Sequence, residues 1–536
     1  MTRISSSGIV VLADMIHMNV DKKSLFPRDP FRFICLFCIV FLPLVSMSPA
    51  LADLQDQIGR FVQSASLGQT KIAVVVRDLD READLVWING DSPMIPASNM
   101  KLLTTAAALA RLGSTFVFRT ELRLLRPPAN TNQGVTVLVH GDGDPALGDA
   151  ALLQRYGLRQ PNGRPTIYDV EDLLQAWVDA VRCAGVVKID RLLINDHVFD
   201  KQFVHPSWPK NQLHRWYCAQ VAGLNFYDNC LDIYPEPGSR IGAAPLIRIV
   251  PEIPNLDATN RAQTGTVHTF WIDRLAGTNK FTYRAKVKHR ARKPAVVTIH
   301  DPPMMFARIF ADRLRRAGVA VMDVDRAPLK DLLPDGQTLH VVQTPLPLVL
   351  ERCNKNSQNL FAEAILKRLG RHETGAQGSW LNGAAAVRIF LNDILGPYSA
   401  VTIVSDGSGL SRDNRVTAQL VVHLLAAMNK DAQLGPVYRN SLALGGGQGS
   451  LKNRLGNLNG DVYGKTGYIK GVSCLSGYLV LESDSGPRSF SFSFLFNGFK
   501  PPVYLNNITS FQDKLLKLID EQLLPTNKHN TISISG

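Results

Sequence analysis

Apolar and polar positions divide the chain into segments of helical and of extended character. Four stretches rich in helix-forming residues each predict a helix, namely residues 54–66, 102–112, 360–370 and 509–523. Three regions instead predict β-structure: a hairpin of residues 71–77 and 84–87, a run at 468–480, and a run at 488–497. In the last run Phe alternates with Ser from Ser489 to Phe494, which is typical of a strand with two different faces.

The N-terminal region has the pattern of an export signal. Residues 34–45 form an apolar run that is too short to span a bilayer comfortably. Basic residues precede the run, and Ala50-Leu51-Ala52 follows it. This order predicts a signal peptide of residues 1–52 with cleavage after Ala52. The mature protein is then expected to be soluble in the periplasm, since no later segment has the length and apolarity of a membrane span.

Composition adds an expectation about partners and one about thiols. The formal net charge of +13 suits an anionic cell-wall or membrane surface, and it equally suits ordinary solubility. No motif points to nucleic acid. In an oxidising compartment Cys218 and Cys230, which share one segment, are the best candidates for a disulfide. The number of cysteines beyond residue 52 is odd, so at least one thiol stays unpaired.

Three short strings carry the candidate chemistry, and the first pairs Ser98 with Lys101. They stand three positions apart, after Pro96 and at the start of the predicted helix that ends before Gly113. This spacing puts a hydroxyl and an amine on one helical face, beside backbone N–H groups that favour a developing oxyanion. Lys101 can serve as the base for Ser98 if burial or a second cation, Lys465, lowers its pKa. Taken alone, the pair is more often an ordinary helix start with an exposed lysine.

The second string is Ser357-Gln358-Asn359, which opens the predicted helix of residues 360–370. A second hydroxyl at this place can relay a proton, and the Asn359 amide can hold a substrate carbonyl. A capping serine with a polar neighbour is the ordinary alternative.

The third string is Lys465-Thr466-Gly467, next to the extended run at 468–480. On a strand edge, Lys465 and Thr466 can bind the carboxylate of a C-terminal peptide, and Gly467 lets a substrate backbone come close. The N–H of Tyr468 can complete an oxyanion hole with that of Ser98. Because all three strings occur in order, each on the required type of element, they favour a serine acyl-transfer site over three coincidences.

With these strings the chain resembles the class C low-molecular-mass penicillin-binding proteins, the D-alanyl-D-alanine carboxypeptidase/endopeptidase family related to penicillin-binding protein 4. Four further segments carry the resemblance: residues 406–412, 141–145, 224–229 and 471–478. The likeness covers essentially everything after the first fifty residues. The chain departs from the family pattern at Gln358, where Asp is common, at Tyr468, where a small hydroxyl residue is usual, and in a glycine-rich segment at 444–450.

The resemblance implies a serine peptidase that cleaves D-Ala-D-Ala bonds, and D-Ala-diaminopimelate cross-links, through an acyl-enzyme. Ser98 would be the nucleophile, Lys101 its base, and Ser357 the relay of the proton to the leaving amine. Peptidoglycan stem peptides would be the substrate and β-lactams the covalent inhibitors. No cofactor or metal is expected, because no complete zinc-peptidase motif is present.

The resemblance also implies roles for the other polar residues of the strings. Asn359 would position both the substrate and Lys101. Lys465 and Thr466 would engage the carboxylate of the terminal D-Ala.

The spacing of the strings predicts a nested, multi-domain α/β architecture. A chain of 536 residues exceeds one ordinary hydrophobic core, and the long segment between the first two strings must leave and return to one site. The predicted parts are a β-lactamase/transpeptidase-like catalytic domain of central antiparallel sheet and flanking helices at 53–120 and 341–526, an inserted α/β domain at 121–200 and 286–340, a small β-rich domain at 201–285, and a flexible tail at 527–536.

Two alternative functions stay open at this point. A serine β-lactamase would share the acyl-enzyme but would hydrolyse it fast, and the long insert favours the peptidase. Outside this class, the chain could be a wall-binding protein with an inactive site, which would form no adduct with a labelled penicillin at Ser98. A Ser-His-Asp hydrolase is disfavoured, because the sequence has no Gly-Xaa-Ser-Xaa-Gly elbow.

Overall fold

A six-stranded antiparallel sheet joins strands from residues 71–88 and 443–497. The computed structural model describes residues 49–125, 135–156, 168–329, 335–484 and 486–524. The strands of this sheet lie in the order β15-β16-β17-β18-β1-β2. Their bounds are Ala443–Leu444, Asp461–Ile469, Val472–Leu481, Arg488–Asn497, Lys71–Asp78 and Ala83–Ile88. The apolar run of the predicted signal peptide and the predicted tail at 527–536 lie outside the described residues.

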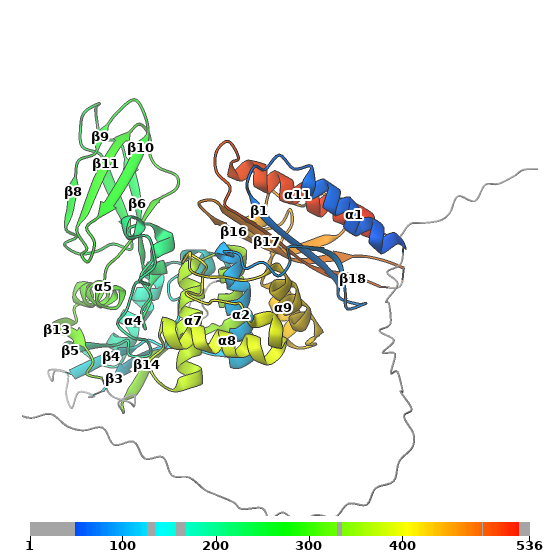
Figure 1. Cartoon of the computed structure of the whole chain (residues 1–536). Helices are drawn as coiled ribbons and strands as arrows, with labels where there is room; N and C mark the ends of the chain where they lie inside the picture. The colour runs from blue at the N-terminus through cyan, green and yellow to red at the C-terminus, as the bar shows by residue number, and fades with distance from the viewer. Residues whose placement is uncertain (1–48, 126–134, 157–167, 330–334, 485, 525–536) are drawn as a thin grey trace, which may run out of the picture. The chain divides into compact units, whose positions relative to one another are not determined.

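Helices cover both faces of this sheet (Figure 1). One face carries α1 (Pro49–Gln63) and α11 (Leu505–Leu523). The other carries α2, α6, α7, α8, α9 and α10, which span Met100–Leu112, Leu346–Lys355, Asn359–Thr374, Trp380–Leu395, Ala418–Lys430 and Leu434–Asn440. Strand β1 shows why two layers form, since successive side chains point to opposite faces: Val74 packs with α1 and α11, whereas Val75 packs with the α2 layer.

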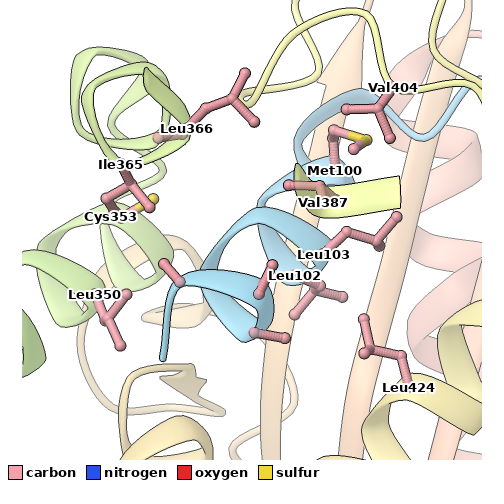
Figure 2. Close-up of a cluster of buried hydrophobic side chains, with 14 of the residues drawn as sticks. Met100, Leu102, Leu103, Leu350, Cys353, Ile365, Leu366, Val387, Val404 and Leu424 are labelled. Atoms are coloured by element: carbon pink, nitrogen blue, oxygen red, sulfur yellow. The ribbon is translucent and has the colours of Figure 1, made fainter. Parts of the chain in front are cut away.

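Helix α2 lies at the centre of the second layer. All but the last three of its residues are buried, and Figure 2 shows Met100, Leu102 and Leu103 surrounded by apolar side chains of the neighbouring helices. Ala106, Ala107 and Ala108 are fully buried as well, so small side chains let the other helices approach. The start of α2 is therefore fixed by packing on every side, which is what positions the chemistry of its first turn.

A five-stranded mixed sheet, β13-β5-β4-β3-β14, lies in the segment between the first two strings. Its strands are Ala320–Arg326, Lys188–Asn195, Val135–His140, Val117–Leu124 and Gln337–Pro345, and its helices are α3, α4 and α5 at Ala150–Tyr156, Val170–Cys183 and Pro302–Arg316. Aromatic side chains of α4 and α5 pack against each other, with Trp177 and Phe306 edge to face. The apolar core of this sheet is separate from the one around α2, and it also takes in buried side chains from the segment 224–299.

Two small sheets complete the described fold. One is β12-β6-β7, with strands Ala295–Thr298, Cys230–Glu236 and Leu246–Val250. The other joins β10, β11, β8 and β9, at Thr269–Arg274, Phe281–Val287, Ala258–Asn260 and Gln263–Thr264. The domain boundaries predicted at residues 120, 285 and 340 fall inside strands β3, β11 and β14. Each of these strands therefore continues across a predicted boundary. The division into domains stays a prediction.

The predicted multi-domain α/β architecture with a central antiparallel sheet is confirmed, and two predicted helices have different ends. The helix predicted at 54–66 ends earlier, at Gln63. The helix expected to stop at Gly370 continues to Thr374 and is capped by Gly375 with φ of +69°. Gly370 instead permits close packing of α7 on α8, because a Cβ there would lie 2.1 Å from Asn382 Oδ1. Gly370 is therefore a packing contact between α7 and α8 and not the end of a helix.

The single extended run predicted at 468–480 is wrong. It is two strands, β16 and β17, joined by a hairpin turn in which Gly471 has φ of +75°. Lys465, Thr466 and Gly467 consequently lie within β16 rather than ahead of a strand.

The predicted disulfide between Cys218 and Cys230 is also wrong, since both are free thiols in the structure. Both side chains are buried, and burial raises the pKa of the Cys218 thiol to about 12. A buried, protonated thiol is a poor nucleophile for disulfide formation. Within the described ranges, every helix is too short or too polar to cross a bilayer.

Candidate active site

Ser98 and Lys101 are held by a tight turn that leads into α2. Ala97–Asn99 forms a 3-10 turn, η1, and α2 follows at once. Ala97 has φ of +45°, a backbone conformation that L residues rarely adopt and that surrounding structure must enforce. Gly409 packs on this residue, because a Cβ there would lie 1.7 Å from the Ala97 carbonyl oxygen. The shape of the turn therefore depends on a glycine at 409.

The Lys101 side chain is fully buried and makes three hydrogen bonds. Its Nζ donates to Ser98 Oγ at 3.0 Å, to Asn359 Oδ1 at 2.7 Å and to the Ser408 carbonyl oxygen at 2.9 Å. The Asn359 amide is oriented by its Nδ2, which donates to the Tyr217 carbonyl at 2.8 Å. Because Asn359 Oδ1 and the Ser408 carbonyl can only accept, a neutral Lys101 amine can keep both bonds and turn its lone pair to the Ser98 hydroxyl.

Lys465 is buried beside the second string. Its Nζ donates to Ser357 Oγ at 2.9 Å and to the Thr466 carbonyl oxygen at 2.7 Å. Ser357 has φ of +58°, so a second non-glycine residue of the site is held in the left-handed region. Asn359, two positions on, is the first residue of α7, and this brings the Ser357 hydroxyl and the Lys101 contacts to one place.

Strand β16 lies directly against η1. A Cβ on Gly467 would be 3.0 Å from the backbone nitrogen of Ser98, so only glycine allows this approach without displacement. Side chains alternate along a strand, which places Lys465 and Gly467 on the buried face of β16 and Thr466 and Tyr468 on the more exposed one. Tyr468 is 54% exposed.

Burial sets the charge state of the two lysines. It lowers the pKa of Lys101 from 10.5 to about 8, against smaller opposing effects of Cys353, Glu363 and Asp406. The pKa of Lys465 lies well below its usual value, first because of burial and then because of the charge on Lys101. Both buried lysines therefore lose a proton more readily than an exposed lysine does. Of the two causes proposed for a lowered Lys101 pKa, burial is the one that the structure supplies.

The loop of residues 406–411 presents the Ser408 carbonyl to Lys101 by wrapping around a buried carboxylate. Glu363 Oε1 accepts from the Ser408 N–H at 2.8 Å, and its Oε2 accepts from the Gly407 N–H at 2.9 Å and from Trp380 Nε1 at 2.8 Å. Burial and, to a smaller extent, the nearby charge of Asp406 together raise the pKa of Glu363 to about 7. The loop is thus locked from inside by hydrogen bonds to one side chain.

Glu363 and the Ser408 carbonyl are functional groups that the sequence interpretation missed. A signal for Glu363 exists, because Asn359, Glu363 and Lys367 follow each other at four-residue spacing and so share one face of α7. All three side chains are buried. A row of polar residues inside an otherwise apolar helix indicates a buried polar network. A backbone carbonyl such as that of Ser408 leaves no such signal.

The structure brings most of the predicted site residues into one cluster. Lys101 contacts Ser98 and Asn359, Lys465 contacts Ser357, and Gly467 packs on the turn that holds Ser98. The side chains of the two remaining predicted residues, Thr466 and Tyr468, make no hydrogen bond to the others within the described chain. A hydroxyl next to a base, with backbone N–H groups beside it, is suited to acyl transfer. The described residues include no group of three His, Cys, Asp or Glu side chains placed to hold a metal ion.

Fold and site together define the class of serine acyl-transfer enzymes that use a lysine as base. Residues 54–517 match the family described as the D-Ala-D-Ala carboxypeptidase 3 (S13) family. The chain belongs to this family, and it is a serine-type D-Ala-D-Ala carboxypeptidase.

Known relatives agree with this assignment. The chain is 30% identical over 507 residues to a D-alanyl-D-alanine carboxypeptidase of Actinomadura sp. strain R39, with 88% of each chain covered. It is 23% identical over 468 residues to the D-alanyl-D-alanine carboxypeptidase DacB of Haemophilus influenzae, covering 82% of this chain and 88% of the relative. Its fold is similar to the crystal structure of penicillin binding protein 4 from Haemophilus influenzae, with a TM-score of 0.70 at 21% identity, over 86% of this chain and 99% of that one.

Proposed function

We propose that the protein is a periplasmic DD-peptidase of peptidoglycan, which releases terminal D-Ala from stem peptides and also cleaves D-Ala-diaminopimelate cross-links. The observation that carries the proposal is the 3.0 Å hydrogen bond between Lys101 Nζ and Ser98 Oγ. Family membership supports D-Ala-D-Ala cleavage, and the net charge of +13 suits an anionic wall.

Acylation starts at Ser98. Neutral Lys101 takes the hydroxyl proton while Ser98 Oγ attacks the carbonyl carbon of the penultimate D-Ala. The N–H groups of Ser98 and Tyr468 hold the oxyanion that develops. Ser357, whose hydroxyl is hydrogen-bonded to Lys465, passes its proton to the leaving amine as the peptide bond breaks, and it receives in return the proton that Lys101 took from Ser98.

Deacylation regenerates the enzyme and is the same step for both cleavages. Water attacks the ester carbonyl while neutral Lys101 takes a proton from it, and Lys101 returns this proton to Ser98 Oγ as the ester bond breaks. Thr466 and Lys465 bind the carboxylate of the leaving D-amino acid. Because the acyl-enzyme is the same in both cases, release of D-Ala and cleavage of a cross-link differ only in the group that leaves.

The direct test is an assay of the purified mature protein on a pentapeptide ending in D-Ala-D-Ala and on cross-linked muropeptides. We expect free D-Ala from the first and monomeric muropeptides from the second, and neither from Ser98→Ala. Mass spectrometry after incubation with a labelled penicillin should show one adduct, on Ser98. A protein that releases no D-Ala and forms no adduct would have an inactive site.

A serine β-lactamase is the alternative that the same experiment excludes. Such an enzyme would turn the penicillin over, whereas the proposed peptidase stays trapped as a long-lived adduct. A solved structure of penicillin binding protein 4 from Haemophilus influenzae, complexed with a β-lactam, matches this chain with a TM-score of 0.65. Export is tested separately, since material recovered outside the cytoplasmic membrane should begin at Asp53.

A further inference from the structure

One face of strand β6 connects the surroundings of the candidate site with a basic pocket. Leu231, Ile233 and Pro235 are buried, whereas the side chains at 232, 234 and 236 are half-buried, so the second set lines the open face. Successive residues of this set are about 7 Å apart along the strand. The face therefore bridges a short distance between two hollows of the surface.

The hollow at the start of β6 adjoins the second string. It is a cavity of about 390 Å³, and its lining includes Asp232 of β6, Val296 of β12 and Gln358 at the start of α7. Gln358 stands between Ser357, which contacts Lys465, and Asn359, which contacts Lys101. The cavity therefore adjoins the second string through Gln358.

The hollow further along β6 is a basic pocket of about 800 Å³, lined by Tyr234, Arg248, His289, Arg290 and Arg292. Arg248 lies over the Tyr234 ring at 4.0 Å from its centroid, which holds the guanidinium flat with its edge available. Arg290 pairs with Glu236 at 3.0 Å. Within the described chain, Arg248 and Arg292 have no carboxylate within 4 Å. Asp232 is the nearby acidic group, and the positive charge of Arg248 partly offsets the rise that burial causes in the pKa of Asp232.

Basic side chains outnumber acidic ones around this pocket. The loop between β11 and β12 carries exposed Lys288 and Lys293 besides His289, Arg290 and Arg292. Facing groups of opposite sign are Glu236, which is already paired, and Asp232, whose pKa is raised by burial. Unpaired guanidinium groups on one wall bind planar carboxylates through paired N–H donors.

We propose that this pocket is an anion subsite for the carboxylates of a neighbouring stem peptide on polymeric peptidoglycan, occupied while another stem is cleaved at Ser98. The inference rests on the proposed function. Asp232 lines the Gln358 cavity and Tyr234, two positions along β6, lines the basic pocket, so only about 7 Å of strand separates the two hollows. This short separation from the hollow beside Gln358, together with the excess of guanidinium groups in the pocket, favours the substrate polymer over an unrelated anionic partner.

The test compares a short substrate with a polymeric one. The variant is Arg248→Gln/Arg292→Gln, and the matched control is Arg388→Gln/Lys500→Gln, which removes the same charge from exposed positions elsewhere. The substrates are a pentapeptide without side-chain carboxylates and un-cross-linked peptidoglycan with pentapeptide stems. The peptidoglycan is also assayed in a form whose internal stem carboxylates are amidated and whose terminal D-Ala carboxylates are free. The readout is kcat/KM for D-Ala release at low and at high salt.

We expect the variant to lose roughly three- to tenfold in kcat/KM on the polymer, as exposed charge contacts are modest, and to match the wild type on the pentapeptide. Amidation should lower kcat/KM of the wild type by the same factor, so that variant and wild type have equal kcat/KM on the amidated polymer. High salt should also remove the difference between the two proteins. The control should behave as the wild type does on every substrate.

Equal rates of variant and wild type on the polymer would overturn the inference without affecting the proposed function. An absence of any effect of amidation would do the same. Loss of binding to anionic phospholipid vesicles or polyphosphate with unchanged polymer kinetics would assign the pocket to another partner, and so would also overturn it. No D-Ala release from the pentapeptide by the wild type would instead refute the proposed function.

Discussion

At the scale of single residues, the site depends on a lysine that is buried without a carboxylate partner. All three N–H positions of Lys101 are used by neutral oxygen atoms, so desolvation is not offset by an ion pair and the pKa falls to about 8. A carboxylate at the position of Asn359 would hold the ammonium charged. An amide there instead accepts one hydrogen bond and leaves the lysine able to lose its proton.

The lowered pKa predicts how acylation depends on pH. The reactive form is neutral Lys101, which makes up about one-tenth of the molecules at pH 7 and about one-hundredth at pH 6 if the pKa is about 8. The rate of adduct formation with a fluorescent penicillin should rise roughly tenfold per pH unit up to pH 7 and level off above pH 8. Stopped-flow measurements at fixed ionic strength check this. A rate that does not change from pH 6 to pH 8 would show that Lys101 is not the titrating base.

Glu363→Gln should disturb the loop that aims Lys101. The carboxylate accepts three N–H donors, and in glutamine one oxygen becomes an NH2 group that faces an N–H. An unsatisfied buried donor costs about 1–3 kcal/mol, so we expect a fall of this size in the free energy of unfolding by urea and slower acylation, because the Ser408 carbonyl shifts. Glu373→Gln is the matched control, since it makes the same change at an exposed position of α7. Equal stability of the two variants would contradict the role given to Glu363.

At the scale of elements, the site is an edge contact between a strand and a turn. Strand β16 approaches η1 so closely that a side chain at Gly467 would meet backbone atoms. The same contact places Gly467 beside the backbone nitrogen of Ser98, next to the oxyanion hole proposed above. A methyl group at 467 should therefore affect catalysis more than it affects stability.

Gly467→Ala tests this contact, with Gly464→Ala as the matched control on the same strand. The Cβ at 467 would lie 2.9 Å from the Pro96 carbonyl oxygen, whereas at 464 it would lie 3.0 Å from a terminal methyl of Leu451, which can rotate away. We expect Gly467→Ala to slow penicillin acylation by about 10²-fold, the size of losing an oxyanion donor, with its melting temperature only slightly lowered. Gly464→Ala should acylate at nearly the wild-type rate. Similar acylation rates for the two variants would argue against an oxyanion hole at this edge.

The same scale shows what the sequence could predict. The first string was placed on its turn correctly, because Pro96, the helix formers after Met100 and Gly113 are local signals. The 468–480 run was misread because apolar residues continue on both sides of the turn at Gly471, so only strand pairing reveals the break. The approach of β16 to η1 joins residues that are far apart in the chain, and no local pattern encodes it.

At the scale of the whole molecule, apolar packing rather than covalent cross-linking joins distant segments. The cluster around α2 contains Ala73 from the first strand and Leu495 from the last. Cys218 and Cys230 belong to this cluster as buried side chains. The described chain thus has no disulfide, and its stability should not depend on redox conditions.

Thermal unfolding with and without dithiothreitol checks this, together with Cys218→Ser, Cys230→Ser and the double variant. Each serine buries a hydroxyl in an apolar site, at a cost of about 1–3 kcal/mol, and without a covalent bond the two costs should add approximately. The melting temperature of the wild type should be the same in both buffers. A disulfide would behave differently: reductant would lower the melting temperature, because losing such a bond costs about 2–5 kcal/mol, and the double variant would be no less stable than either single one. That pattern would mean that the two thiols pair when the protein is exported.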